Sequence, residues 1–222
     1  MIEAISFVNK IQEKYPAPTN HKVQFDINDI KRFENAFGAE LPSDYYEFLQ
    51  AYGYGSFNDY FYILNPFIEN GTEAFIKENE REKESYEFLE QGNSATLTNG
   101  KLAYIDCCFS DKELVVVNGN KELAEFLRTE KIDDYTRSKI IALGDHYPYE
   151  FFPKEGGLIY FGRTDDDSFF VRINGAKTSV VMYCDGYYEF DMSITEFIYE
   201  YLTKTMKLPM MSDENEWSFI SY

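Results

Sequence analysis

The sequence contains few residues of the types that carry acid–base or nucleophilic catalysis. Histidine occurs twice, at His21 and His146. His146 follows Asp145, and such a pair could act as a catalytic base, although a loop histidine with a local hydrogen bond is the plainer interpretation. No G-x-S-x-G nucleophile motif occurs. Among 39 acidic residues no pattern singles out the two carboxylates that glycoside hydrolysis needs. We therefore predict no catalytic residue and keep an acid–base hydrolase only as a weaker alternative.

Three consecutive acids, Asp165, Asp166 and Asp167, could bind a cationic group. They could grip an arginine or lysine of another protein, or they could bind a metal cation. The calcium-loop pattern requires glycine at its sixth position, where this chain has Phe170. A solvated hairpin turn is the alternative that turn propensities favour. We therefore predict no metal site and retain the three acids as candidate partner-binding residues.

Tyrosines next to acids form two further candidate binding surfaces. Tyr54, Asp59 and Tyr60 follow a predicted helix and could line a surface groove. The motif Gly53-Tyr54-Gly55 follows a helix and not a strand, so it is no dinucleotide-binding fingerprint. The second set surrounds the last predicted hairpin, where exposed tyrosine beside acids would make good interface anchors, with a core position as the alternative. Its members are Asp185, Tyr187 and Glu189.

The charge of the chain excludes several classes of partner. Lys plus Arg number 21 and Asp plus Glu number 39, so the formal net charge is −18. Neutralising nucleic-acid phosphates requires clustered basic residues, and an anionic membrane surface repels an acidic protein. We therefore expect no direct nucleic-acid partner and no membrane partner. Both halves of the chain are acidic, so an acidic surface must be assembled by folding.

Cysteine usage and the first residues predict a cytoplasmic protein without cofactors. The three cysteines, Cys107, Cys108 and Cys184, form no C-x-x-C motif and leave an odd count. This favours reduced thiols over a disulfide framework or a zinc site. The chain begins without a basic segment ahead of an apolar one, so we expect no signal peptide.

Apolar periodicity predicts the elements that must position these residues. Threefold spacing of apolar residues indicates a helix within residues 2–14. A second helix begins after Asp26 as N-cap and ends at Gly38. A third helix runs to Gly53, with Ser43 or Asp44 as its cap. A strand is predicted over 60–64 and a charge-rich helix over 72–90.

The C-terminal third reads as an antiparallel meander closed by a helix. Four apolar runs, over 158–161, 169–173, 180–183 and 187–190, are separated by turn residues. Asn174-Gly175 and Asp185-Gly186 are signals for tight turns whose two central residues have positive φ. A capping box of Ser193 and Glu196 then begins a helix.

The predicted fold class is α+β, with helices packed on one side of a mostly antiparallel, twisted sheet. We expect one domain over residues 21–206, with an enlarged middle region over 68–137. Residues 1–20 are expected to form a helical arm with a linker, and residues 207–222 a tail that contains the single tryptophan, Trp217.

Two stretches of the sequence follow a known pattern in order and spacing. The first lies within residues 30–49 and contains Leu41-Pro42-Ser43-Asp44-Tyr45. The second lies within 152–197, contains Gly156-Gly157 before a strand, and ends in Ser193-Ile194-Thr195-Glu196-Phe197. Together they cover about half of the chain and resemble the SUKH superfamily, which has an "LPxDY" helix entry and a closing "(S/T)xxEF" helix. The region over 68–137 is longer than the compact core of that family.

The resemblance implies a non-enzymatic α+β binding module. Bacterial members are mostly immunity proteins that block polymorphic or contact-dependent toxins, often nucleases, and a fungal relative is a regulatory scaffold in cell-wall signalling. The toxin domain of a secreted protein, with a basic nuclease cleft, is therefore the expected partner, because an acidic inhibitor complements such a cleft. The alternative is a regulatory or scaffold module with an endogenous cytoplasmic partner. The sequence leaves the oligomeric state open.

Overall fold

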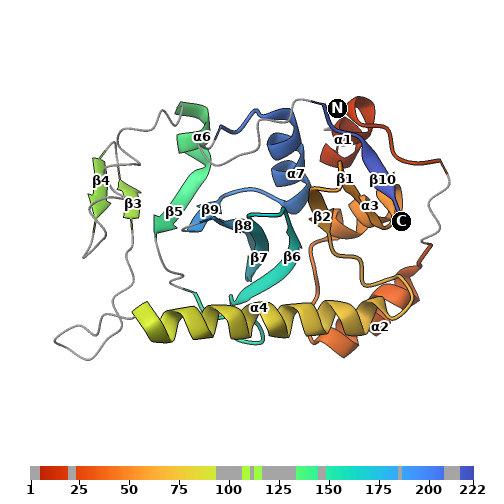
Figure 1. Cartoon of the computed structure of the whole chain (residues 1–222), viewed down its shortest axis with the longest axis horizontal. Coiled ribbons are helices and arrows are strands. Elements are labelled where there is room, and N and C mark those ends of the chain that lie inside the picture. The colour runs from red at the N-terminus through yellow and green to blue at the C-terminus, as the bar shows by residue number, and fades with distance from the viewer. Residues whose placement is uncertain are drawn as a thin grey trace.

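A single antiparallel sheet organises the molecule (Figure 1). The computed structural model describes residues 6–19, 24–93, 107–110, 113–116, 134–144, 149–184, 187–207 and 216–222. Within these segments ten strands pair in the order β10-β1-β2-β6-β7-β8-β9-β5-β3-β4. The strands are β1 (Gly55–Phe57), β2 (Phe61–Ile63), β3 (Cys107–Ser110), β4 (Glu113–Val116), β5 (Ile140–Gly144), β6 (Leu158–Arg163), β7 (Ser168–Asn174), β8 (Lys177–Tyr183), β9 (Tyr187–Phe190) and β10 (Phe219–Ser221).

Helices cover both faces of this sheet. Figure 1 shows α1, α3 and α7 gathered near β1 and β10, whereas the long α4 runs apart from them and alongside α2. The predicted α+β class and antiparallel sheet are confirmed, but the helices do not all lie on one side, because α4 packs against the opposite face. The helices are α1 (Phe7–Lys14), α2 (Ile27–Phe37), α3 (Ser43–Tyr52), α4 (Gly71–Asn93), α6 (Asp134–Lys139) and α7 (Ile194–Thr203).

The predicted meander is confirmed in the consecutive strands β6, β7, β8 and β9. The turn between β7 and β8 differs from the prediction. Asn174 pairs with Lys177, so the two loop residues are Gly175 and Ala176 and not Asn174 and Gly175. Among the described residues of this turn only Gly175 has positive φ, at +62°. One positive φ at the first loop position is the pattern of a type II′ turn, which places glycine where an L side chain would be strained.

Successive side chains of a strand point to opposite faces of the sheet, and a hydrophobic core lies on each face. On the larger face, Phe169 of β7 packs against Phe197 of α7 with ring centroids 5.1 Å apart. On the other face, Phe170 packs against Tyr86 of α4 with ring centroids 5.7 Å apart. Successive residues of one strand therefore serve different cores, as the twofold period of a strand requires.

Buried tyrosines find acceptors for their hydroxyl groups, as buried tyrosine requires. Tyr52 of α3 donates to the carbonyl of Tyr15 at 2.5 Å, and Tyr15 donates to the carbonyl of Leu202 in α7 at 2.8 Å. Val8 and Ile11 of α1 are buried in the same core. These bonds tie α1, α3 and α7 together.

The cap of α2 is confirmed. Asp26 accepts from the backbone N–H groups of Asn28 at 2.7 Å and Asp29 at 3.0 Å, and Asp29 closes a capping box. Gly38 ends the helix at φ +92°. These bonds satisfy N–H groups that a helix start leaves without partners.

The predicted cap of α3 is wrong, and the reason connects the two sequence motifs. The N-cap position of α3 is Pro42, with no side-chain cap bond. Asp44 turns away to α7, where Oδ2 accepts from the backbone N–H and the hydroxyl of Thr195, both at 2.8 Å. The aspartate of LPSDY thus caps the helix that carries SITEF, 151 residues later. Both motifs therefore maintain the fold.

The predicted cap of α7 is confirmed in part. Ser193 is the N-cap and its hydroxyl accepts from the backbone N–H of Glu196 at 3.2 Å. The Glu196 carboxylate does not complete a capping box, because Oε1 accepts from Nζ of Lys139 at 2.6 Å. This ion pair fixes α6 against α7.

Candidate functional site

A cavity of about 280 Å³ lies between residues of α4 and the β1–β2–β6 end of the sheet. Tyr54 and Tyr62 stand at its sheet side, and Glu78 and Arg81 of α4 stand opposite them. Its lining also includes the apolar side chains of Leu64 and Phe75. Aromatic walls with a few charged groups at the rim suit the binding of a protein side chain.

The charges at this cavity are mixed. Arg81 forms an ion pair with Glu78. The guanidinium of Arg163 lies 5.2 Å from the ring centroid of Tyr62, within cation–π range. Burial raises the pKa of the neighbouring Glu82 carboxyl above its ordinary value. The cavity therefore offers aromatic surface and paired charges, and it has no strong field of one sign.

An aromatic and acidic corner adjoins the cavity. We define the Tyr222 corner as Tyr54, Ser56, Asp59 and Tyr222. The Tyr222 hydroxyl is hydrogen-bonded to the Asp59 carboxylate and lies 2.6 Å from the hydroxyl of Ser56. The rings of Tyr54 and Tyr222 meet edge to face with centroids 5.4 Å apart. Desolvation, and then the hydrogen bond to Asp59, raise the pKa of Tyr222 to about 12, so this phenol stays a hydrogen-bond donor at neutral pH.

The backbone of this corner is held by Asn58. Asn58 and Asp59 have φ values of +55° and +51°, a region that asparagine and aspartate tolerate better than most residues. The Asn58 side chain donates to the carbonyl of Glu216 at 2.7 Å and accepts from the N–H of Ser218 at 2.8 Å. The segment that leads into β10 is therefore fixed to the β1–β2 turn.

The structure brings several of the predicted binding residues to one end of the sheet. Asp59 is exposed in the corner, and Tyr54 lies beside it, half-buried. Tyr60 follows and packs on Trp217 with ring centroids 6.1 Å apart, and burial raises its pKa. Arg163, at the end of β6, pairs with Tyr62 of β2, so the adjoining β6–β7 turn lies near Tyr60.

Within that turn the three aspartates differ. Asp165 and Asp166 are exposed. Asp167 is 2% exposed and accepts from the Thr164 hydroxyl at 3.1 Å. Burial raises the pKa of Asp167, and Tyr201 donates to the same carboxylate oxygen at 3.4 Å. Two of the three acids therefore face solvent and the third stabilises the turn from inside.

The predicted residues of the last hairpin lie elsewhere. Tyr187 and Glu189 share a face of β9, as alternation predicts, but both are buried. Glu189 accepts from the Ser179 hydroxyl at 2.5 Å and from Nη1 of Arg172 at 3.2 Å. Three strands separate β9 from β2 in the sheet. Asp185 lies outside the described residues.

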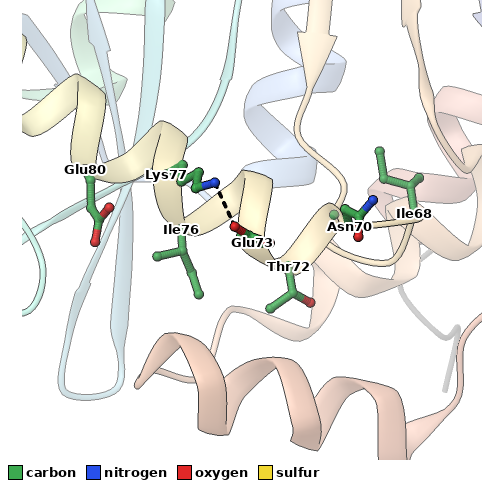
Figure 2. Close-up of a pocket in the computed structure, with 8 residues that line it drawn as sticks. Ile68, Asn70, Thr72, Glu73, Ile76, Lys77 and Glu80 are labelled. Atoms are coloured by element: carbon green, nitrogen blue, oxygen red, sulfur yellow. Dashed lines mark ion pairs between the residues drawn. The ribbon is translucent and has the colours of Figure 1, made fainter.

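A second cavity, of about 470 Å³, lies on the other side of the first turns of α4 (Figure 2). Thr72 and Ile76 point from α4 toward α2. Lys77 and Glu73 form an ion pair of 2.7 Å between side chains that are 69% and 68% exposed. Ion pairs between side chains this exposed contribute little to the stability of the fold, and each of the two charges already has a partner. We therefore assign no binding role to the Lys77–Glu73 pair of this groove.

Sequence reasoning did not identify Tyr62, Glu78, Arg163 or Tyr222. Tyr222 and Asp59 are separated by 163 residues, and their contact depends on the pairing of β10 with β1. No local pattern signals such a pair, although acidic and aromatic residues at both positions are visible in the sequence.

Among the described residues, no three His, Cys, Asp or Glu side chains are grouped so that they could hold a metal ion. In the same part of the chain no helix combines the length and apolar character needed to cross a bilayer. The SMI1 / KNR4 family (SUKH-1) model matches residues 25–203. Neither the curated proteins nor the solved structures gave a match.

Proposed function

Because the chain belongs to the SMI1/KNR4 family (SUKH-1), we propose that it is a non-enzymatic immunity protein of the bacterial cytoplasm. In this role it binds the toxic domain of a secreted polymorphic or contact-dependent toxin and blocks the active cleft of that domain. The family match over residues 25–203, which spans α2 to α7, is the observation that carries the proposal.

The charge of the chain supports a basic toxin, such as a nuclease. A nuclease binds phosphate and therefore has a basic cleft, and a protein with a net charge of −18 complements its potential. Opposite charge speeds the encounter and lets the inhibitor compete with nucleic acid. Association should accordingly slow as salt screens the charges.

The end of the sheet that carries the Tyr222 corner is the proposed contact surface. Exposed acids there are Asp59, Asp165 and Asp166, with Tyr54 and Tyr60 beside them. Tyrosine rings can cover a basic cleft with apolar area, while the acids beside them form ion pairs at the rim of the interface. We assign Asp167 the role of supporting this surface from within, because its side chain is buried in the β6–β7 turn. Tyr187 and Glu189 are buried in β9, which three strands separate from β2, and are not part of the proposed surface.

The test is co-expression with the toxin domain encoded next to this chain. We expect the chain to restore growth of cells that make the toxin, and to co-elute with a catalytically inactive toxin domain in size-exclusion chromatography. Failure of both would contradict the proposal. It would favour the alternative of a regulatory module with an endogenous partner, for which the neighbouring gene encodes no secreted protein.

Matched charge variants test the proposed surface. The double variant D165N/D166N removes two exposed acids from the β6–β7 turn. The control E150Q/E155Q removes two exposed acids from the loop before β6, at the opposite end of that strand. At low salt we expect the association rate to fall by about tenfold for the first and less than about twofold for the second. An equal fall in association rate for both double variants would show that net charge drives the association and that no localised surface is involved.

A further inference from the structure

The strand β10 forms an edge of the sheet. It pairs with β1 and stands at the end of the strand order, so within the described residues no strand covers its outer side. Figure 1 places it at the margin of the molecule beside the C-terminal end. It lies beyond residue 203, where the family match ends. This edge is therefore a feature of the present chain outside the matched region.

The hydrogen bonds of β10 show which backbone groups face outward. The N–H of Tyr222 donates to the carbonyl of Tyr54 at 2.9 Å, and the carbonyl of Ser218 accepts from Asn58 at 3.0 Å. Residues along an antiparallel strand alternate between bonding inward and bonding outward. The N–H and C=O groups of Phe219 and Ser221 therefore point away from β1, where another strand could bond to them.

This edge lacks the features that usually block pairing. From Trp217 to Tyr222 the sequence contains no Lys, Arg, Asp, Glu or Pro. Ile220 and Tyr222 are 37% and 51% exposed, and they are among the large hydrophobic side chains that the described residues leave exposed. Native proteins protect sheet edges with charges, proline or a covering element, so an uncharged exposed edge indicates an interaction surface.

The edge is also preformed. The ring of Phe219 packs on Tyr52 and Phe57 with centroids 4.9 and 5.1 Å away. Trp217 is 7% exposed. At Gly55, an added Cβ would lie 2.0 Å from the carbonyl oxygen of Ile220, so the absence of a side chain permits close pairing. A strand already held in place loses little further freedom when a partner binds.

We propose that β10 binds an extended, basic segment of the toxin as an added strand, an inference that rests on the proposed immunity function. The outward groups of Phe219 and Ser221 bond to the backbone of that segment, as in other β-augmentation complexes. Its lysine or arginine side chains contact the Tyr54–Tyr222 ring pair and the exposed Asp59 carboxylate of the Tyr222 corner.

Charge favours this occupant over a second copy of the chain. Pairing of two β10 strands would join two molecules that each carry a net charge of −18 and would bring the exposed Asp59 and Glu216 side chains of each copy to the same junction. Like charges opposed across an interface disfavour it. A basic segment gains from the same charges.

The variant S221P tests the backbone bond. Proline removes the outward N–H of Ser221, whereas the bonds to β1 come from Tyr222 and Ser218 and stay available. The control S221A keeps that N–H. Affinity for the purified, catalytically inactive toxin domain is measured by isothermal titration calorimetry. The emission of Trp217 verifies that β10 is still docked.

We expect S221P to weaken binding by at least about tenfold and S221A by less than about twofold. Amide hydrogen exchange at Phe219 and Ser221 should slow by at least about tenfold in the wild-type complex. If the wild-type chain binds but S221P binds equally well and these amides stay unprotected, the role of β10 is overturned and the immunity function stands. If the wild-type chain does not bind the toxin, both fail. Self-association that S221P abolishes would assign the edge to a second copy and overturn the proposed occupant.

Discussion

The contact between Asp44 and Thr195 makes a quantitative prediction about stability. The change D44A removes the carboxylate that accepts from the backbone N–H and the hydroxyl of Thr195, both at 2.8 Å. The first of these bonds satisfies an N–H in the first turn of α7, and no other described side chain accepts from it. The variant therefore leaves that helix start without one of its caps, while Ser193 still caps Glu196.

The expected loss follows from the two bonds. A hydrogen bond to a charged group contributes about 1.5–3 kcal/mol when buried, and loss of a helix cap costs about 0.5–2 kcal/mol. Asp44 is half-buried, so values near the lower end of each range apply. We expect D44A to lower the free energy of unfolding by about 2–3 kcal/mol, and a chain of this size should then melt about 5–10 °C earlier.

The assay is urea unfolding followed by the emission of Trp217. D44N keeps an acceptor oxygen without the charge, so it should lose about 1 kcal/mol. S43A changes the exposed neighbour and should stay within about 0.5 kcal/mol of wild type. In a double-mutant cycle, D44A and T195V should show a coupling energy of about 1 kcal/mol. A D44A variant as stable as S43A, or additive effects of D44A and T195V, would refute the assignment of Asp44 as a cap of α7.

Three further predictions concern buried charges and close packing. Burial raises the pKa of Asp167, so its contribution to stability is present below its ordinary pKa and is lost as pH rises through the folded value. D167N should therefore flatten the decline in stability that urea unfolding measures as pH rises above the ordinary aspartate pKa. E189A leaves the Arg172 guanidinium without its carboxylate partner and should cost about 3 kcal/mol in chemical denaturation, with no change in the rate of partner association measured by surface plasmon resonance. G55A should displace β10 and shift the emission of the single tryptophan to longer wavelength, because the added Cβ would lie 2.0 Å from a backbone oxygen. In the control G175A the added Cβ has no atom within 4 Å. This variant should lower the free energy of unfolding by about 1 kcal/mol through the positive φ of the residue, and it should leave the emission unchanged.

Local rules predicted the elements well where the determinants are local. The Asp26 cap, the Gly38 terminator and the four-strand meander all depend on residues within a few positions of one another. The same rules were wrong at Asp44, because an aspartate beside a helix start can cap that helix or another one, and the sequence does not indicate which. They also misplaced the turn at Gly175 by one residue, since a strand can extend through asparagine when glycine alone supplies the positive φ.

Alternation predicted which residues share a face but not whether that face is exposed. Tyr187 and Glu189 lie on one face of β9, as predicted. A strand with polar residues on one face usually turns that face to solvent. Here the charge of Glu189 is compensated by Arg172 and Ser179 within the sheet, and tyrosines cover the same face. The same alternation in the sequence therefore fits two kinds of strand: one whose polar face is buried around an ion pair, and one whose polar face is exposed to water.

The partner surface depends on one long-range pairing that the sequence pattern does not contain. The acids are spread over both halves of the chain, so charge alone selects no face. When β10 pairs with β1, Tyr222 contacts Asp59 and Tyr54. Asp59 and Tyr54 were predicted from the sequence as binding residues, but the sheet edge that this pairing places beside them was not predicted. The same pairing exposes the outward backbone groups of Phe219 and Ser221. The location of the surface is therefore a consequence of sheet topology, and its chemistry is a consequence of residue types that the sequence already displays.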